Sequence, residues 1–212
     1  DVNIMDSNNG TALKYALIHA LKSENIFILW LLVAAGAQAE LGYSADVSPL
    51  DRALSSNRPD IVRVLLDAKA DVKKLLEHGM LPLETAIRKN MVGCVRHLVA
   101  AGLDLSQCKD PSLTIDLLNI TVKKNDSCML GLLIAAKVDV DAGNSPGVRN
   151  PLITALRRRS YSIDVIETLL TAGFRVDACV FWNGGTPLFC DKVLENPRLL
   201  KRLLRALCHQ TG

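Results

Sequence analysis

The side chains best suited to chemistry, the histidines and cysteines, are scattered through this 212-residue chain without a shared spacing. His19, His78, His97 and His209 lie far apart, and none forms a metal-ligand set with Cys or Asp. Cys208 and His209 are an isolated pair near the end of the sequence. A metal site needs several ligands at compatible spacing, so we expect neither a metal ion nor a cofactor.

Two further catalytic patterns are incomplete. Gly184-Gly185 could begin a phosphate-binding loop, but the Gly-Lys-Ser/Thr sequence that completes such a loop does not follow. A cysteine nucleophile needs a histidine and an orienting group beside it, and no sequence pattern places them together. We therefore expect a protein that is not an enzyme.

Basic residues, in contrast, recur in pairs: Arg88-Lys89, Lys123-Lys124 and Arg157-Arg158. Each pair follows a repeated leucine by the same number of residues, so the three pairs occupy one structural position in successive repeats. Lys and Arg at this position could simply complement the dipole at a solvated helix end. Three pairs in register favour a basic groove instead, because an acidic partner would relieve the repulsion between neighbouring pairs.

The repeat that positions these pairs is marked by a leucine near the start of each copy. The six marks are Leu13, Leu50, Leu83, Leu118, Leu152 and Leu188, spaced 33 to 37 residues apart. In five of the six copies a small residue, Ala or Thr, follows three positions later. Residues three apart share a helix face, so this pattern lets a neighbouring helix approach closely.

The clearest copy is Leu81–Asp104. It predicts a turn at Leu81-Pro82-Leu83, a helix over Glu84–Lys89, a break at Asn90 and a second helix over Val92–Ala101. The fourth copy places the corresponding turn at Asp116-Leu117-Leu118 without a proline. In the first copy, about four extra residues between Ala16 and Trp30 predict longer helices.

Residues that tolerate a left-handed backbone are expected at two points of each copy. The breaks after the first helix carry Asn57, Asn90 and Asn125. The ends of the second helices carry Gly36, Gly102 and Gly173, with Lys69 and Lys137 at the same place in two copies. The two lysines should therefore hold a strained backbone.

The turn, the first helix, the Val-x-x-Leu-Leu second helix and the glycine end together resemble the ankyrin-repeat family. The resemblance implies an all-α solenoid of helix-turn-helix units joined by hairpin loops, although the histidine of the family's Thr-Pro-Leu-His pattern is absent. It divides the chain at approximately 1–38, 39–71, 72–104, 105–139, 140–177 and 178–212, with Asp1-Val2-Asn3 as the tail of a preceding repeat. It also implies a fragment of a longer protein that binds a protein or acidic peptide through a concave groove and hairpin tips.

Aromatic residues mark a second candidate binding surface. Phe181 and Trp182 lie in the hairpin before the last repeat, in a chain of which only 4% is aromatic. Exposed aromatic side chains beside Arg are common interface anchors, but these two could equally pack beneath the hairpin. Tyr43, in the Ala37–Val47 hairpin, is a weaker candidate of the same kind.

The cysteine content predicts where the protein is located, and the length of the apolar runs predicts that none of them spans a membrane. The six cysteines lack the density of a secreted disulfide scaffold, which favours reduced thiols in an intracellular protein, cytoplasmic or nuclear. The longest apolar run, Ile26–Ala35, is about half the length that crosses a bilayer, so it predicts a buried core helix.

Two alternative functions remain open. Asn196–Leu204 faintly resembles the start of a SOCS box, which would make the chain a substrate receptor of a cullin-type ubiquitin ligase, although Leu204 stands where that motif has Cys. The basic pairs could also bind nucleic acid. Single-strand binders interleave basic residues with stacking aromatics, however, and the paired positions contain none.

Overall fold

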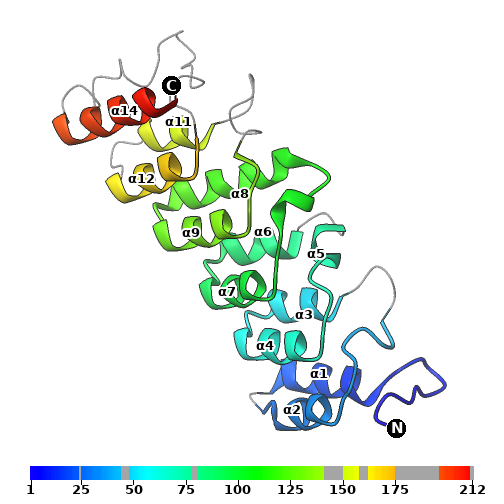
Figure 1. Cartoon of the computed structure of the whole chain (residues 1–212). Coiled ribbons are helices and arrows are strands. Elements are labelled where there is room, and N and C mark those ends of the chain that lie inside the picture. Colours follow the sequence, from blue (N-terminus) through cyan, green and yellow to red (C-terminus); the bar gives the residue numbers. More distant parts are fainter. Residues whose placement is uncertain are drawn as a thin grey trace. The chain divides into compact units, whose positions relative to one another are not determined.

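The computed structural model describes residues 1–23, 25–43, 48–77, 81–140, 150–157, 162–174 and 196–210, without the side chains of Pro111, Leu207, His209 and Gln210. In these ranges the chain forms helices and one isolated bridge between Met5 and Thr11, with no strand (Figure 1). The predicted all-α fold is confirmed. The chain divides into two compact units, Asp1–Asp104 (unit 1) and Leu105–Gly212 (unit 2), which are considered separately.

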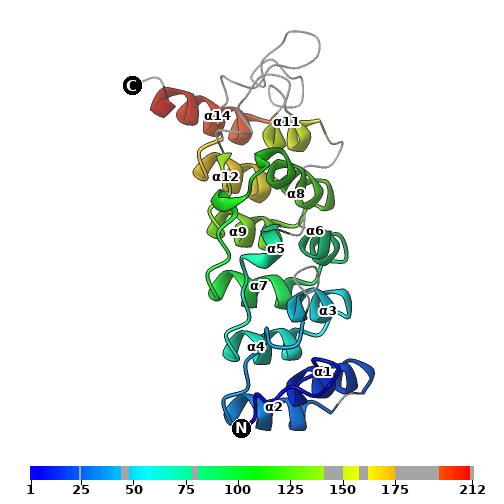
Figure 2. The same ribbon diagram turned by 90° about the vertical axis from the view of Figure 1, so that its right-hand side faces the viewer.

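Unit 1 is a stack of helical hairpins. Its helices are α1 (Ala12–Lys22), α2 (Phe27–Ala34), α3 (Pro49–Ser55), α4 (Pro59–Asp67), α5 (Lys74–Glu77), α6 (Leu81–Arg88) and α7 (Val92–Ala100). The first helices of the hairpins form one row, in which α3 packs on α1 and α6 packs on α3 (Figure 2). The second helices form a parallel row in the order α2, α4, α7.

Unit 2 repeats this arrangement. It contains a 3₁₀ turn η1 (Leu105–Gln107) and the helices α8 (Pro111–Lys124), α9 (Ser127–Ala135), α11 (Pro151–Leu156), α12 (Ile163–Thr171) and α14 (Pro197–Gln210). α8 packs on α9 within one hairpin and on α11 in the next, and α12 packs on both α9 and α14. Each unit is therefore two helices deep, with its core between the rows.

The repeated leucines form the centre of that core. Five of the six marks are almost completely buried, and so are the small residues three positions later: Leu13, Leu50, Leu83, Leu118 and Leu152, with Ala16, Ala53, Ala86, Thr121 and Ala155. The sixth mark, Leu188, lies outside the described residues. Small side chains beside the leucines allow the first helices of neighbouring hairpins to come close, as the spacing predicts.

The expected left-handed residues are confirmed. Asn57, Asn90 and Asn125 have φ of 51°, 58° and 59° at the breaks, and the three predicted glycines have φ between 87° and 97° at the helix ends. Lys69 and Lys137 adopt φ of 59° and 58° where the other copies carry glycine. These two lysines thus hold a backbone conformation that a side chain disfavours.

Two predicted helix starts are wrong. α8 already begins at Pro111, so Asp116-Leu117-Leu118 is not a turn but the middle of a 14-residue helix. The reason is a strong start signal upstream, because the Asp110 carboxylate accepts a hydrogen bond from Ser112 N (2.9 Å) and proline occupies the first helical position. α6 likewise begins at Leu81, with the predicted turn forming its first residues.

The prediction of a buried core helix over Ile26–Ala35 is also wrong. The run forms α2, but Leu29 is its one buried residue, and Phe27, Ile28, Trp30 and Leu31 are largely exposed. Of the two helices expected to be extended, α1 is long at 11 residues, whereas α2 has 8. Hydropathy identifies the helix faces that could be buried, but a face is buried only where a neighbouring helix packs on it.

Candidate functional site

The basic pair of unit 1 stands at the carboxyl end of α6. Arg88 is the last residue of the helix, and Lys89 follows it directly before the left-handed Asn90. The Arg88 guanidinium forms an ion pair with Glu84, one turn earlier, with Nη2 and Oε1 2.6 Å apart. Both basic side chains are exposed, but half of the pair's charge is therefore already balanced within its own helix.

Unit 2 places two basic positions at the ends of adjacent helices. Lys123 and Lys124 are the last residues of α8, and Arg157 caps α11; all three are exposed. Thr154 Oγ1 donates a hydrogen bond to Asn119 Oδ1 (2.7 Å), which fixes α11 alongside α8 in register. Since Lys123 and Arg157 follow these bonded residues by about one turn, they lie at the same end of the two packed helices.

The basic positions of the two units differ in the residue that precedes them by one helical turn. The residue one turn before Lys123 is Asn119 and the residue one turn before Arg157 is Ile153, whereas Glu84 precedes Arg88. Cations at a helix carboxyl end are stabilised by the helix dipole. The structure places Lys123, Lys124 and Arg157 at the same end of two adjacent helices, and a binding role for them stays a prediction. Arg158 lies outside the described residues, and the continuation of the series to Arg88 remains a prediction.

Tyr43, the third candidate surface, is only partly accessible. Lys14 Nζ lies 5.5 Å from the centre of its ring and donates a hydrogen bond to the Gly42 carbonyl (2.6 Å). The Tyr43 hydroxyl is buried and has no hydrogen-bond partner among the described residues, and burial raises the pKa of Tyr43 to about 12. Gly42 has φ of 79°, and a Cβ there would approach Asn9 O to 2.5 Å. The loop that carries Gly42 and Tyr43 is thus closely packed against the N-terminal loop that carries Asn9.

Several other sequence predictions fall on α14 or beyond the described ranges. Phe181 and Trp182 lie outside the described residues. Asn196–Leu204 covers the start of α14, in which Leu199 and Leu203 are buried and Arg202 pairs with Glu167 of α12 (Nε to Oε1, 2.6 Å). A SOCS-box role for this segment remains a prediction. The buried leucines show that it packs on its neighbour in the stack.

The described ranges also bear on metal binding, thiols and membranes. No group of three or more His, Cys, Asp or Glu side chains within them could hold a metal ion. Cys94, Cys108, Cys128 and Cys208 form no disulfide there, and burial raises the pKa of Cys94 to about 11. None of the described helices has the length and hydropathy needed to cross a membrane.

The comparison of helices α2 and α4 reveals a surface that the sequence pattern did not predict. α2 presents large apolar side chains to solvent, while the equivalent helix α4 buries its own. A signal was present, because α2 is apolar on every side, and such a helix needs cover all round. Hydropathy alone could not show that one side of it lacks a neighbour.

Comparison with known proteins agrees with this architecture. Residues 17–108 match the family model of ankyrin repeats in three copies. The B-cell lymphoma 3 protein homolog of Mus musculus is 25% identical over 181 residues, which are 84% of this chain and 40% of that protein. The E3 ubiquitin-protein ligase KEG of Arabidopsis thaliana is 27% identical over 74% of this chain, but only 10% of its own length. The chain thus spans less than half of these relatives.

Solved structures show the same fold. The ankyrin repeat domain of Bcl-3, described as a unique member of the IkappaB protein family, matches with a TM-score of 0.56 and 22% identity, over 93% of this chain and 86% of that one. The human ASB11 ankyrin repeat domain matches with a TM-score of 0.51 and 19% identity, over 97% and 87%. At such identities the likeness establishes the fold.

Proposed function

We propose, from the premise that this chain is an ankyrin-repeat protein, that it is a non-catalytic interaction module holding an acidic segment of a partner protein. In unit 2 the segment would lie along the ends of the first helices, where Lys123, Lys124 and Arg157 stand. The predicted binding roles of Arg88, Lys89 and Tyr43 concern unit 1 by itself. Repeats of this kind bind proteins through surfaces shared by several hairpins. Affinity would come from a few anchors, and the basic charges would steer the encounter.

One observation carries the proposal. Lys123 and Arg157 occupy the same end of the packed helices α8 and α11, where both side chains are exposed. Adjacent packed helices are about 10 Å apart, a distance that an extended acidic peptide covers in about three residues. Carboxylates at that spacing could reach both positions.

The test uses a fluorescein-labelled peptide of repeated Glu-Gly-Gly, which places a carboxylate at every third residue, and measures its anisotropy with the full chain. Lys123→Glu is expected to weaken binding at least fivefold and to flatten its salt dependence, because it replaces attraction with repulsion. Lys109→Glu is the matched control. It makes the same charge change in unit 2, but just before the opposite end of α8, and should alter the dissociation constant less than twofold.

Two results would contradict the proposal. Equal weakening by Lys123→Glu and Lys109→Glu would show attraction to the net charge of the unit rather than to this position. Tighter binding of a 20-nucleotide oligothymidylate than of the peptide at physiological salt would favour the nucleic-acid alternative. Salt series for both probes with the unaltered chain provide the comparison.

A further inference from the structure

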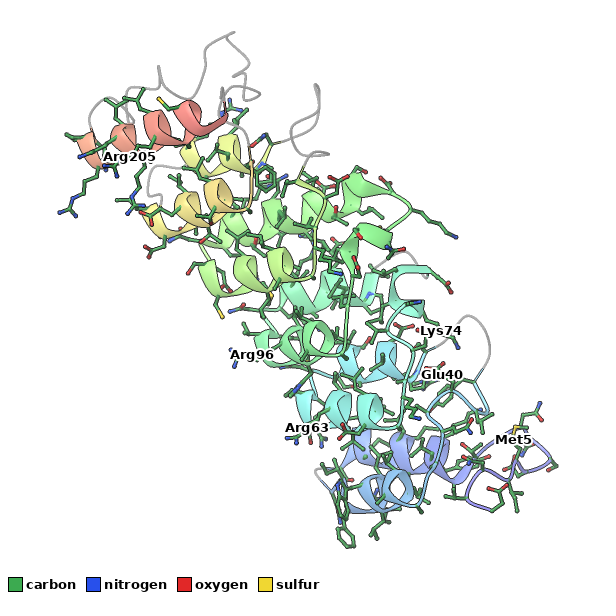
Figure 3. All side chains as sticks on the ribbon, in the orientation of Figure 1. Met5, Glu40, Arg63, Lys74, Arg96 and Arg205 are labelled. Carbon is green, nitrogen blue, oxygen red and sulfur yellow. The ribbon has the colours of Figure 1, made fainter. Side chains whose placement is uncertain are left out.

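Helices α12 and α14 of unit 2 border a groove whose two walls carry opposite charge. The helices pack together, and Arg205 of α14 lies at the groove between them (Figure 3). The groove has a volume of about 520 Å³, which is within the range of ligand pockets. We call it the basic groove, because four cations face two carboxylates across it. Its charged lining residues are Asp164 and Glu167 of α12 and Arg198, Lys201, Arg202 and Arg205 of α14.

The repeat keeps this side of its helices open to solvent. Arg205 stands two residues after the buried Leu203, and a buried leucine recurs at the same place in α4 and α12. The residues two positions after it in those helices are Asp67 and Thr171. Both are exposed, although α4 and α12 each have a helix on either side. A further repeat stacked beside α14 would therefore leave the basic groove open.

The basic wall is a single face of α14. Arg198, Lys201 and Arg205 are spaced by three and four residues, so their exposed side chains lie next to one another along the helix. Arg202, on the same wall, forms an ion pair with Glu167 (Nε to Oε1, 2.6 Å). Within the described part of unit 2 the other three cations form no ion pair. Because like charges at this spacing destabilise a helix, a bound anion would stabilise α14.

A phosphate group suits this wall better than a carboxylate does. Phosphoserine carries close to two negative charges near neutral pH and has three acceptor oxygens, so one phosphate can accept hydrogen bonds from two basic side chains. Arginine can bind it through two parallel N–H groups. Neighbouring positions on one helix face are about 5 to 6 Å apart, and two long side chains starting there can converge on a single phosphate.

The acidic wall limits what else can bind. Asp164 and Glu167 would repel further phosphates placed along the groove, which disfavours a nucleic-acid strand or an anionic lipid surface. One phosphate on an otherwise neutral segment avoids that wall. We propose that the basic groove binds a phosphoserine or phosphothreonine of a partner protein, with the phosphate held between Lys201 and Arg205. The inference does not rest on the proposed function, because the basic groove shares no residue with the ends of α8 and α11.

The test measures the anisotropy of a fluorescein-labelled heptapeptide, Ala-Gly-Ala-phosphoserine-Ala-Gly-Ala, with the full chain. This phosphopeptide is expected to bind at least tenfold more tightly than the same peptide with serine, and at least threefold more tightly than with glutamate. Arg205→Gln should weaken its binding at least fivefold. Lys109→Gln is the matched control, since it removes one positive charge from unit 2 outside the basic groove, and it should change the dissociation constant less than twofold.

Two further comparisons sharpen the assignment. Asp164→Asn removes a carboxylate from the acidic wall and should strengthen binding of the phosphopeptide by about twofold. Lys123→Gln should not alter that binding, and Arg205→Gln should not alter binding of the Glu-Gly-Gly peptide, so this inference and the proposed function can fail separately. Matching far-UV circular dichroism and melting temperatures verify that each variant is folded.

Three results would overturn the proposal. Equal affinity for the phosphorylated and the serine peptide would show that the phosphate is not recognised. Equal weakening by Arg205→Gln and Lys109→Gln would show attraction to the net charge of unit 2. A 20-nucleotide oligothymidylate that binds more tightly than the phosphopeptide, and that loses affinity with Arg205→Gln, would assign the basic groove to nucleic acid.

Discussion

Helices α2 and α4 occupy the same place in successive repeats, yet their side chains differ greatly in solvent exposure. Ile61 of α4 is completely buried, whereas Ile28 of α2, the same residue type at the same position, is more than half exposed. α4 has helices on both sides in its row, and within the described part of unit 1 α2 has one. Burial in a stack of repeats is thus decided by the neighbours of a residue as much as by its own hydropathy.

The largest expected difference is between alanine substitutions at the two isoleucines. Ile61→Ala should lower the free energy of unfolding by about 3 kcal/mol, because it opens a cavity in a close-packed site. Ile28→Ala should lower it by less than about 1 kcal/mol, since little area returns to water. Urea unfolding measures both. Equal losses would mean that Ile28 is already covered.

The link between the first two hairpins should have the next largest effect. Arg58 donates hydrogen bonds to the carbonyl oxygens of Ala20 and Ser23, each at 2.9 Å, and pairs with Asp60 at 2.7 Å. Arg58→Ala should lower the free energy of unfolding by about 1 to 2 kcal/mol, because two carbonyl groups lose a charged donor. Arg63→Ala is the control, since its side chain points away from the stack (Figure 3). Its effect should stay within about 0.5 kcal/mol.

The same link predicts a pH dependence. The hydrogen bond from Arg58 holds the pKa of Asp60 below its usual range. A depressed pKa means that the contribution is present above the unfolded-state value of about 3.9 and is lost as the pH falls below it. Acid titration of stability should therefore show a smaller loss below pH 4 in Arg58→Ala than in the unaltered chain. An identical acid limb in both proteins would contradict this assignment.

A smaller change in stability is expected at the left-handed residues that follow α2 and α4. Gly36 and Lys69 both have positive φ, 87° and 59°. Lys69→Gly should raise the free energy of unfolding by about 0.5 kcal/mol, after the greater freedom of glycine in the unfolded chain is subtracted from the relieved strain. Gly36→Ala should lower it by about 1 kcal/mol through backbone strain, since no atom lies within 4 Å of the added Cβ. Thermal unfolding resolves both, and shifts of the same sign would contradict the strain argument.

The smallest expected effect on stability concerns the ion pair between Arg88 and Glu84 in unit 1. Glu84→Gln removes the carboxylate that balances Arg88, and because both side chains are partly exposed, stability should fall by at most about 0.5 kcal/mol. The substitution should instead strengthen binding of the acidic peptide and steepen its salt dependence. Asp116→Asn, in the middle of α8, is the charge-matched control. Equal changes in affinity would show that net charge alone controls the peptide.

Much of this fold could be predicted because each repeat uses local signals. The small residues follow the buried leucines by three positions and the asparagine breaks follow them by seven, so both signals lie close to the mark in sequence. The start of α8 was predicted wrongly because the prediction relied on the leucine mark rather than on the helix-start signal at Asp110-Pro111. For the candidate site, spacing predicted that Lys123 and Arg157 would share a helix end, and the hydrogen bond between Asn119 and Thr154 fixes that register.

The errors concern what lies beside a residue in space. The pairing of Arg88 with Glu84 could have been found, since residues four apart on a helix face each other. The exposure of Ile28 could not, because hydropathy contains no information about whether a second helix is present. The partly buried position of Tyr43 could not be predicted either. It depends on the loop around Asn9, which contacts Gly42 but is distant from it in sequence.

The one-sided cover of α2 also has a consequence for how the molecule opens. Local unfolding requires less free energy where fewer apolar contacts break, so the first hairpin should open many times before the hairpins that follow it. Amide hydrogens in α2 should then exchange with deuterium well before those in α4, giving a gradient of protection along unit 1. A helical layer packed on α2 would slow that exchange, so the same gradient would report whether this face is covered.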